Sequence, residues 1–242
     1  MVKFTFFGGI HPYDGKDLSK EQSIKEYLPK GDMIYPLSQH IGAPAKPVVK
    51  KGDKVLAGQM IAEADGYVSA PVYATVSGTV KAIEPRRVVT GDGVMSIVVE
   101  NDLEYNEVPF SQPKPVELLL KEEILSLIQN AGVVGMGGAG FPTHVKLAPK
   151  DPDKIDFVII NCAECEPYLT SDYRRMMEEP EKLVEGLKII LRLFDKARGI
   201  LAVEDNKKDC IRLLKKLTEE DDRISYYLLQ QEFPLLYQTS AK

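Results

Sequence analysis

The sequence predicts an α/β protein in which a small all-β module precedes a Rossmann-like, doubly wound parallel sheet. Two observations lead to this prediction. Between residues 33 and 100, short β-rich runs alternate with glycine-containing turns, which is typical of a small all-β module. From residue 156 onward, short apolar runs alternate with amphipathic helical patterns, and a β-α-β-α-β order favours a parallel sheet.

Composition narrows the class of protein. The 242 residues suffice for one large domain or two modest ones, and the 44% hydrophobic and 28% charged residues are typical of a globular protein. A net charge of −5 argues against nucleic acid as the main partner. Three cysteines fit a reducing compartment better than a disulfide scaffold. No apolar stretch approaches the roughly twenty residues of a transmembrane helix, so we expect no direct membrane span.

Four segments follow one another along the chain. Residues 1–32 are expected to form an irregular N-terminal arm, because glycine and proline punctuate them. Residues 33–100 form the β-rich module, and residues 101–114 form a proline-containing linker. Residues 115–242 form the α/β domain.

The β-rich module resembles the barrel-sandwich fold of biotinyl and lipoyl carriers. The expected strands are residues 47–49, 55–56, 60–62, 79–83 and 95–99. A true carrier places a modified lysine at a hairpin tip. The corresponding turn here runs from Glu63 to Tyr67 and contains no lysine. The sequence therefore predicts the fold without the carrier function.

The α/β domain begins with a helix from Pro115 that ends at Gly132. Further strands are expected at residues 156–160, 199–203 and 224–229, with helices from about residue 181 and over residues 207–217. Ligands of parallel sheets bind at the carboxyl ends of the strands. Residues 161–166 and 204–206 are therefore expected at the edge of a site.

The densest group of glycines lies between the first helix of this domain and its first strand. Residues 132–147 read GVVGMGGAGFPTHVKL, with four glycines within six positions: Gly135, Gly137, Gly138 and Gly140. Glycine lets backbone N–H groups turn toward a ligand, and concave arrays of N–H groups bind anions. Lys146 adds a mobile positive charge. The alternative is a tight loop without a ligand.

A second candidate segment follows the strand at residues 156–160. Asn161, Glu164 and Glu166 offer donors and acceptors to a ribose, a ribityl chain or an amide. The alternative is an acidic turn exposed to solvent. Cys162 and Cys165 form a C-x-x-C pair, but a metal site normally needs four ligands, so we expect no metal site. We interpret them as two buried, unreactive thiols, with a redox dithiol as the alternative.

Five segments in order resemble the C subunit of the Rnf complex, the membrane-associated ferredoxin:NAD⁺ oxidoreductase of bacteria. They are GGIHPYDGK, LSQHIGAPAKPVVKKGDKVLAGQMI, SAPVYATVSGTV, GMGGAGFPTHVKL and INCAECEPYLTSDYRRMMEEPEKL. The middle of the chain is also similar to the flavin- and NADH-binding subunit of respiratory complex I. Proline-reductase-linked electron-transfer proteins share this architecture and are a close alternative.

The resemblance implies that residues 115–242 bind FMN and NAD(H). The implied cofactor-binding residues are Gly135, Gly137, Gly138, Gly140, Phe141, Lys146, Asn161, Glu164 and Glu166. Asn161 and Glu164 would face FMN, Glu166 would face NADH, and Phe141 would lie near the nicotinamide. The flavin supplies the redox chemistry, so no catalytic acid or base is demanded of the side chains.

The chain departs from the complex I pattern at three positions. Met136 replaces an arginine, Ala163 an aspartate and Tyr168 a glycine. The family also continues into a further β-rich domain and a ferredoxin-like domain with two 4Fe-4S clusters. We therefore expect the chain to be truncated, the clusters to lie in the missing region, and the chain alone to bind FMN poorly and be inactive.

The resemblance further implies a peripheral electron-transfer protein at the cytoplasmic face of the cell membrane. Its partners would be the other subunits of an Rnf-type complex, NADH and, through the complex, ferredoxin. Two alternatives remain. One is a non-catalytic scaffold within the same complex, and the other is a swivelling carrier with a covalent prosthetic group.

Overall fold

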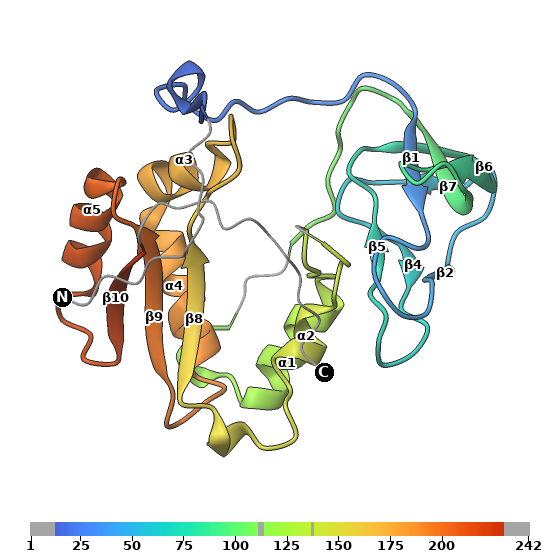
Figure 1. The fold of residues 1–242 in the computed structure, drawn as a ribbon. Coiled ribbons are helices and arrows are strands. Elements are labelled where there is room, and N and C mark those ends of the chain that lie inside the picture. The colour runs from blue at the N-terminus through green and yellow to red at the C-terminus, as the bar shows by residue number, and fades with distance from the viewer. Residues whose placement is uncertain (1–12, 111–113, 137, 230–242) are drawn as a thin grey trace. The chain divides into compact units, whose positions relative to one another are not determined.

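A computed structural model describes residues 13–110, 114–136 and 138–229 (Figure 1). The chain divides into two compact units. The barrel unit comprises Tyr27–Lys150. The parallel-sheet unit joins Met1–Glu26 to Asp151–Lys242. In it the described residues 13–26, the N-terminal segment, fold with residues far along the chain.

Two antiparallel sheets form the barrel unit, in the orders β1-β7-β6-β3 and β2-β4-β5. Their strands are β1 Met33–Pro36, β2 Lys46–Pro47, β3 Lys54–Val55, β4 Met60–Glu63, β5 Val72–Tyr73, β6 Gly78–Arg87 and β7 Gly93–Asn101. Ile61, Val76 and Ile97 are fully buried in one core that residues of both sheets share. The predicted small all-β module is confirmed.

Each predicted strand of the module has a counterpart, but β1 and β5 were not predicted. β5 has two residues, too few to show an alternating pattern. In β1, only Tyr35 is buried, so its sequence carries little periodicity. Pairing with β7, in which Ile34 lies opposite Val98, defines this strand instead.

The helices of the barrel unit are the short 3-10 helix η2 Val116–Leu118, α1 Lys121–Asn130 and α2 Thr143–Lys146. The predicted start at Pro115 is wrong for α1, because Leu119 is extended and interrupts the helical run. Glu123 instead accepts a hydrogen bond from the Leu120 N–H at 2.9 Å and caps α1. The predicted end is confirmed, since Gly132 adopts φ +67° one residue beyond the C-cap Ala131 of α1.

The parallel-sheet unit contains the strands β8 Phe157–Cys162, β9 Arg198–Glu204 and β10 Ile224–Leu229. They lie in the order β10-β9-β8 and both pairs are parallel. Its helices are η1 Lys16–Leu18, η3 Pro152–Lys154, α3 Ser171–Glu178, α4 Pro180–Leu191 and α5 Lys208–Thr218. The predicted α/β class and β-α-β-α-β order are confirmed. Helix α3 was missed because only Met176 in it is buried, so its sequence shows no apolar stripe.

Helix α4 packs closely against the sheet and runs behind β8 and β9 in Figure 1. A Cβ at Gly199 would lie 2.9 Å from Leu187 Cδ2 and 3.0 Å from Leu191 Cδ1. Glycine in β9 therefore permits the close approach of the two elements. Arg223 holds the C-terminal end of α4, donating to the carbonyl oxygens of Leu191, Phe194 and Ala197 at 2.7–3.2 Å.

None of the helices in the described residues is long and apolar enough to cross a membrane.

Gly199→Ala is expected to lower the free energy of unfolding by about 1–3 kcal/mol, because the added methyl group overpacks the contact with Leu187 and Leu191. Gly186→Ala is the matched control. A Cβ at Gly186 in α4 meets nothing within 4 Å, so this change should stabilise by about 0.5–1 kcal/mol through helix propensity. Urea denaturation of both variants measures the difference, and equal stabilities would contradict the packing.

Candidate cofactor site

The glycine loop, residues 132–142 of the barrel unit, is closed at its base by backbone pairing. Val134 and Pro142 form an antiparallel bridge. The Gly135 N–H donates to the Phe141 carbonyl oxygen at 3.0 Å, and the Thr143 N–H donates to that of Val133 at 3.0 Å. These bonds hold the two arms of the loop together.

Glycine is required at position 140 for a structural reason that the sequence did not reveal. It adopts φ +63°, and a Cβ there would lie 2.7 Å from the Gln39 carbonyl oxygen and 2.9 Å from His40 Cα. The neighbouring Ala139 carbonyl oxygen accepts from the Ile41 N–H at 2.9 Å. Gly140 is therefore needed where the loop packs on the barrel module.

Two buried histidines brace the same region. His40 Nε2 accepts from the Ala70 N–H at 3.1 Å, and His144 Nε2 lies 3.0 Å from the Tyr67 carbonyl oxygen. The Tyr67 ring also meets His144 edge-to-face, with centroids 5.8 Å apart. Both imidazoles therefore act in packing and hydrogen bonding within the barrel unit.

The tip of the loop presents unused donors. Among the described residues, the backbone N–H groups of Met136, Gly138 and Ala139 have no hydrogen-bond acceptor, and all three residues are exposed. Lys146 is also exposed in α2 and has no ion-pair partner in the described part of the chain. Exposed N–H groups and an exposed ammonium group are both able to bind an anion such as a phosphate. Gly137 lies outside the described residues.

The acidic loop, residues 163–170 of the parallel-sheet unit, follows directly on β8. Asn161 is exposed near the end of β8, and its Oδ1 accepts from the Ala163 N–H at 3.1 Å. Glu166 is exposed. The side-chain amide of Asn161 and the carboxylate of Glu166 are thus accessible to a ligand.

Glu164 differs from its neighbours because its side chain is buried. Its Oε1 accepts from the Asp172 N–H at 2.8 Å and from Ser171 Oγ at 3.3 Å. Its Oε2 accepts from the Tyr173 N–H at 3.4 Å. The carboxylate therefore caps the N-terminus of α3, where unpaired N–H groups and the helix dipole favour a negative charge.

Two buried lysines and a second glutamate surround Glu164. Its Oε2 lies 4.0 Å from Lys16 Nζ and 3.9 Å from Lys207 Nζ. Lys207 Nζ in turn lies 2.7 Å from Glu204 Oε2, although that pair is not aligned as a hydrogen bond. All four side chains are at least nine-tenths buried. Two positive and two negative charges thus balance inside the unit.

This network confirms that the two predicted strand ends lie together. Cys162 of β8 pairs with Val203 of β9, which brings the segments at residues 161–166 and 204–206 to one edge of the sheet. The sequence did not single out Lys16 or Lys207. For Lys16 the available signal was the motif GGIHPYDGK, whose last residue it is.

Burial raises the pKa of three ionisable groups beside this network. It raises the pKa of the Cys162 thiol to about 11 and that of Cys210 to about 12. Burial, and then repulsion from Glu164, raises the pKa of Asp172. Cys165 is exposed, so the interpretation of both C-x-x-C thiols as buried is wrong for this residue. Cys165 lies in the loop beyond β8, where the strand pattern no longer predicts burial.

Two cavities of the parallel-sheet unit border the acidic segment or the charge network. One of about 270 Å³ is bordered by Asn161 and Cys162 of β8 and by residues of α3 and α4. The other, of about 340 Å³, is bordered by Lys16, Lys207 and Asn206. Within the described ranges, no three His, Cys, Asp or Glu side chains are grouped to hold a metal ion.

Comparison with known proteins identifies both halves of the chain. Residues 4–104 match the RnfC barrel sandwich hybrid domain, and residues 128–235 match the Nuo51 FMN-binding domain. The chain is a homologue of the C subunit of Rnf complexes. The resemblance seen in the sequence is thereby confirmed, as is the order of a barrel-sandwich module before an FMN-binding domain.

Named relatives agree with this assignment. The chain is 44% identical to the C subunit of the Na⁺-translocating ferredoxin:NAD⁺ oxidoreductase complex of Acetobacterium woodii, over 95% of this chain and 52% of that protein. It is 45% identical to the proton-translocating counterpart of Clostridium ljungdahlii, over 90% and 48%. It is 36% identical to the C subunit of the ion-translocating oxidoreductase complex of Vibrio cholerae, over 90% and 28%. The chain spans about half the length, or less, of these relatives.

The predicted cofactor residues all fall within the matched FMN-binding domain. Gly135, Gly138, Gly140, Phe141 and Lys146 belong to the barrel unit, as does the undescribed position 137. Asn161, Glu164 and Glu166 belong to the parallel-sheet unit. Their contact with a cofactor stays a prediction.

Alkylation distinguishes the exposed thiol from the buried ones. With iodoacetamide at pH 8, we expect Cys165 to react first, because it is exposed. Cys162, with a pKa of about 11, should carry roughly one thiolate in a thousand at that pH and be buried besides. Peptide mass spectrometry with and without denaturant measures the order. Equal labelling of Cys162 and Cys165 in the folded chain would contradict the structure.

Proposed function

We propose that this chain supplies the FMN- and NAD(H)-binding part of a peripheral electron-transfer subunit in a membrane-bound, ion-translocating ferredoxin:NAD⁺ oxidoreductase. The main support is the match of residues 128–235 to the Nuo51 FMN-binding domain, which contains every predicted cofactor residue. Two relatives are named as C subunits of ferredoxin:NAD⁺ oxidoreductase complexes and a third as the C subunit of an ion-translocating oxidoreductase complex, which supports the class of reaction.

The residues present fit a phosphorylated flavin. Exposed N–H groups at Met136, Gly138 and Ala139, together with the exposed Lys146, offer hydrogen bonds and charge to a phosphate. Phe141 is 37% exposed and can stack on a planar ring. FMN, when bound, accepts a hydride and releases electrons singly.

The acidic segment also offers polar groups to the proposed ligands. Asn161 can donate to and accept from a ribityl chain or a ring amide, and Glu166 can accept from ribose hydroxyls or an amide. Glu164 holds the N-terminus of α3 and places a buried negative charge at the strand ends. In this proposal these residues bind and orient the cofactors, and none of them transfers a proton.

The remaining parts of the proposal concern the whole protein. The partners would be the other subunits of an Rnf-type complex, NADH and, through the complex, ferredoxin, at the cytoplasmic face of the membrane. Two 4Fe-4S clusters would lie in the part of the relatives that this chain does not cover. We further propose domain boundaries at residues 32, 100 and 114, weak FMN binding by these 242 residues alone, and no turnover.

FMN titration tests the site. Lys146→Ala should weaken FMN binding by roughly tenfold, as expected for the loss of one charge-assisted hydrogen bond of about 1.5 kcal/mol. Riboflavin lacks the phosphate, so its affinity should be unchanged by the same substitution. Quenching of flavin fluorescence measures both, and Lys51→Ala, an exposed lysine of a barrel turn, is the matched control.

Three results would contradict the proposal. The first is no FMN binding at any concentration, which would favour the non-catalytic scaffold. The second is equal loss of FMN and riboflavin affinity in Lys146→Ala, which would remove the phosphate contact. The third is a covalent adduct in the intact mass, which would favour a carrier.

A further inference from the structure

We infer that Lys16, in the N-terminal segment, is a positioning residue for the acidic loop that carries Glu164 and Glu166. This inference rests on the proposed function, because it assigns the loop to the cofactor site. Lys16 itself touches no cofactor in this proposal. It acts by fixing the backbone of the loop.

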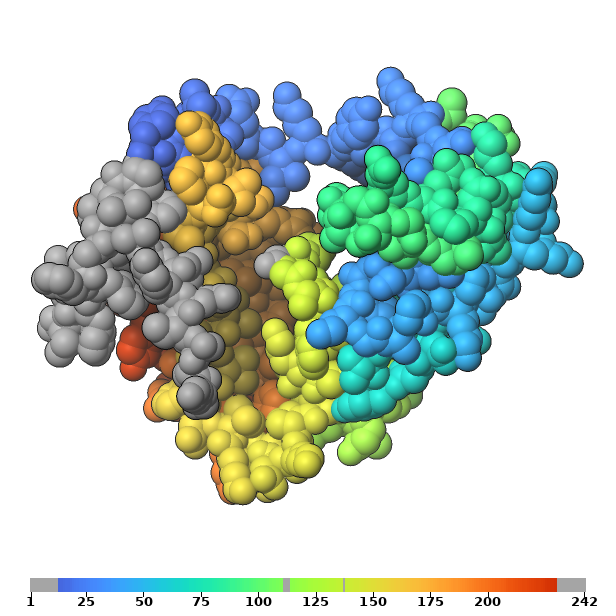
Figure 2. All heavy atoms as spheres, turned by 45° about the vertical axis from the view of Figure 1, so that its right-hand side comes forward, coloured from blue at the N-terminus to red at the C-terminus, as the bar shows by residue number. Residues whose placement is uncertain are grey.

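The N-terminal segment binds the acidic loop and α3 directly, although about 150 residues separate them in sequence. The Tyr168 N–H donates to the Asp14 carbonyl oxygen at 2.6 Å, and Ser19 Oγ lies 2.9 Å from Thr170 Oγ1. Arg174 of α3 donates to the Lys20 carbonyl oxygen at 3.1 Å. In Figure 2 the blue atoms of this segment lie against the gold atoms of the acidic loop and α3.

Lys16 makes the central contacts of this interface. Its ammonium group donates to the Glu166 carbonyl oxygen at 2.9 Å and to the Leu169 carbonyl oxygen at 2.6 Å. The two bonds span the turn of the loop. The same group lies 4.0 Å from Glu164 Oε2, and the Lys16 side chain is only 10% exposed. A buried ammonium is costly unless paired, so the two carbonyl acceptors and the nearby carboxylate hold it in one place.

A close contact between Gly15 and Tyr168 explains one departure from the complex I pattern. Tyr168 stands where that relative has glycine, and it adopts φ +66°, a conformation that side-chain-bearing residues rarely take. A Cβ at Gly15 would overlap Cε1 of the Tyr168 ring, so the ring packs where Gly15 has no side chain. Tyr13 meets the ring edge-to-face at 6.3 Å. The N-terminal segment thus maintains the unusual backbone of the loop.

Loss of Lys16 would affect both glutamates of the acidic loop. The carbonyl group of Glu166 would lose its donor, so the backbone that carries the Glu166 carboxylate would become mobile. Glu164 would keep Lys207 at 3.9 Å but lose one of its two nearby positive charges. A negative charge that is less well compensated and a mobile loop both weaken a site for an anionic cofactor.

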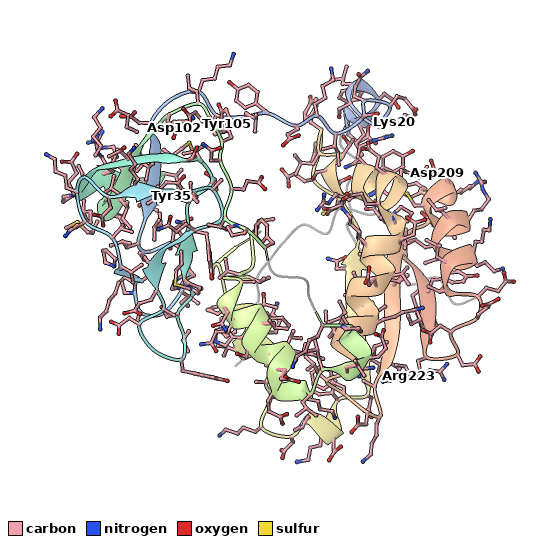
Figure 3. All side chains as sticks on the ribbon, turned by 180° about the vertical axis from the view of Figure 1, so that it is seen from behind. Lys20, Tyr35, Asp102, Tyr105, Asp209 and Arg223 are labelled. Atoms are coloured by element: carbon pink, nitrogen blue, oxygen red, sulfur yellow. The ribbon has the colours of Figure 1, made fainter. Side chains whose placement is uncertain are left out.

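Amide hydrogen exchange of the unliganded 242-residue chain, followed by NMR, tests the positioning. In Lys16→Met the amides of Tyr168, Asp172 and Tyr173 should exchange about tenfold faster, while Val203 in β9 keeps its protection. Lys16→Arg should restore most of the protection, because a guanidinium can donate to both carbonyl oxygens. Lys20→Met is the matched control. Lys20, labelled in Figure 3, is a half-buried lysine of the same segment whose side chain pairs with Asp17.

FMN titration of the same variants provides the second readout. Lys16→Met should weaken FMN binding by roughly tenfold, Lys16→Arg by less than about threefold, and Lys20→Met should leave it unchanged. If Lys16→Met unfolds the unit, Gly15→Ala serves instead. It keeps the charge but obstructs the Tyr168 ring, and it should speed exchange at Tyr168 unless combined with Tyr168→Gly.

The outcomes separate this inference from the proposed function. Wild-type exchange at Tyr168 and Asp172 in Lys16→Met would overturn the inference. Faster exchange with unchanged FMN affinity would also overturn it, because the loop would then lie outside the site. If the wild-type chain binds no FMN, the proposed function fails. The inference then fails as well, because the loop would not belong to a cofactor site even if hydrogen exchange shows that Lys16 holds it.

Discussion

The buried charge network around Glu164 is the constraint on which the parallel-sheet unit depends. Glu164 caps α3, faces Lys16 and Lys207, and is connected through Lys207 to Glu204 at the end of β9. Removing one member would leave a buried charge without its partner, which costs several kcal/mol. One set of charges thus ties the N-terminal segment, the first two strands and α3 to the same edge of the sheet.

That edge is also where a parallel sheet binds its ligands. The network therefore lies at the edge where the proposed function places the ligands. The described hydrogen bonds of the Glu164 carboxylate all go to residues of α3. Asn161 and Glu166 beside it are exposed. Accessible polar groups that are supported by a buried charge network are suited to hold a polar cofactor without rearrangement.

Much of the fold follows from local patterns. The turn-punctuated β runs, the amphipathic helices α4 and α5, and the apolar runs of β8, β9 and β10 were predictable, because each has its own periodicity or turn chemistry. β5 is too short to show a pattern, and α3 presents a single buried residue. The glycines illustrate the same limit. Gly140 was predicted as a ligand contact, whereas the structure adds a backbone approach to Gln39 and His40.

The sequence by itself determined the fold class, the order of the two folds, and the glycine-rich and acidic segments as the candidate site, since these depend on neighbouring residues. Only the tertiary structure decided which polar side chains are buried. Lys16 and Glu164 are about 150 residues apart, and nothing local in either segment requires them to meet. Their pairing arises from packing the N-terminal segment against the strand ends, where a charge must find a partner or remain in water.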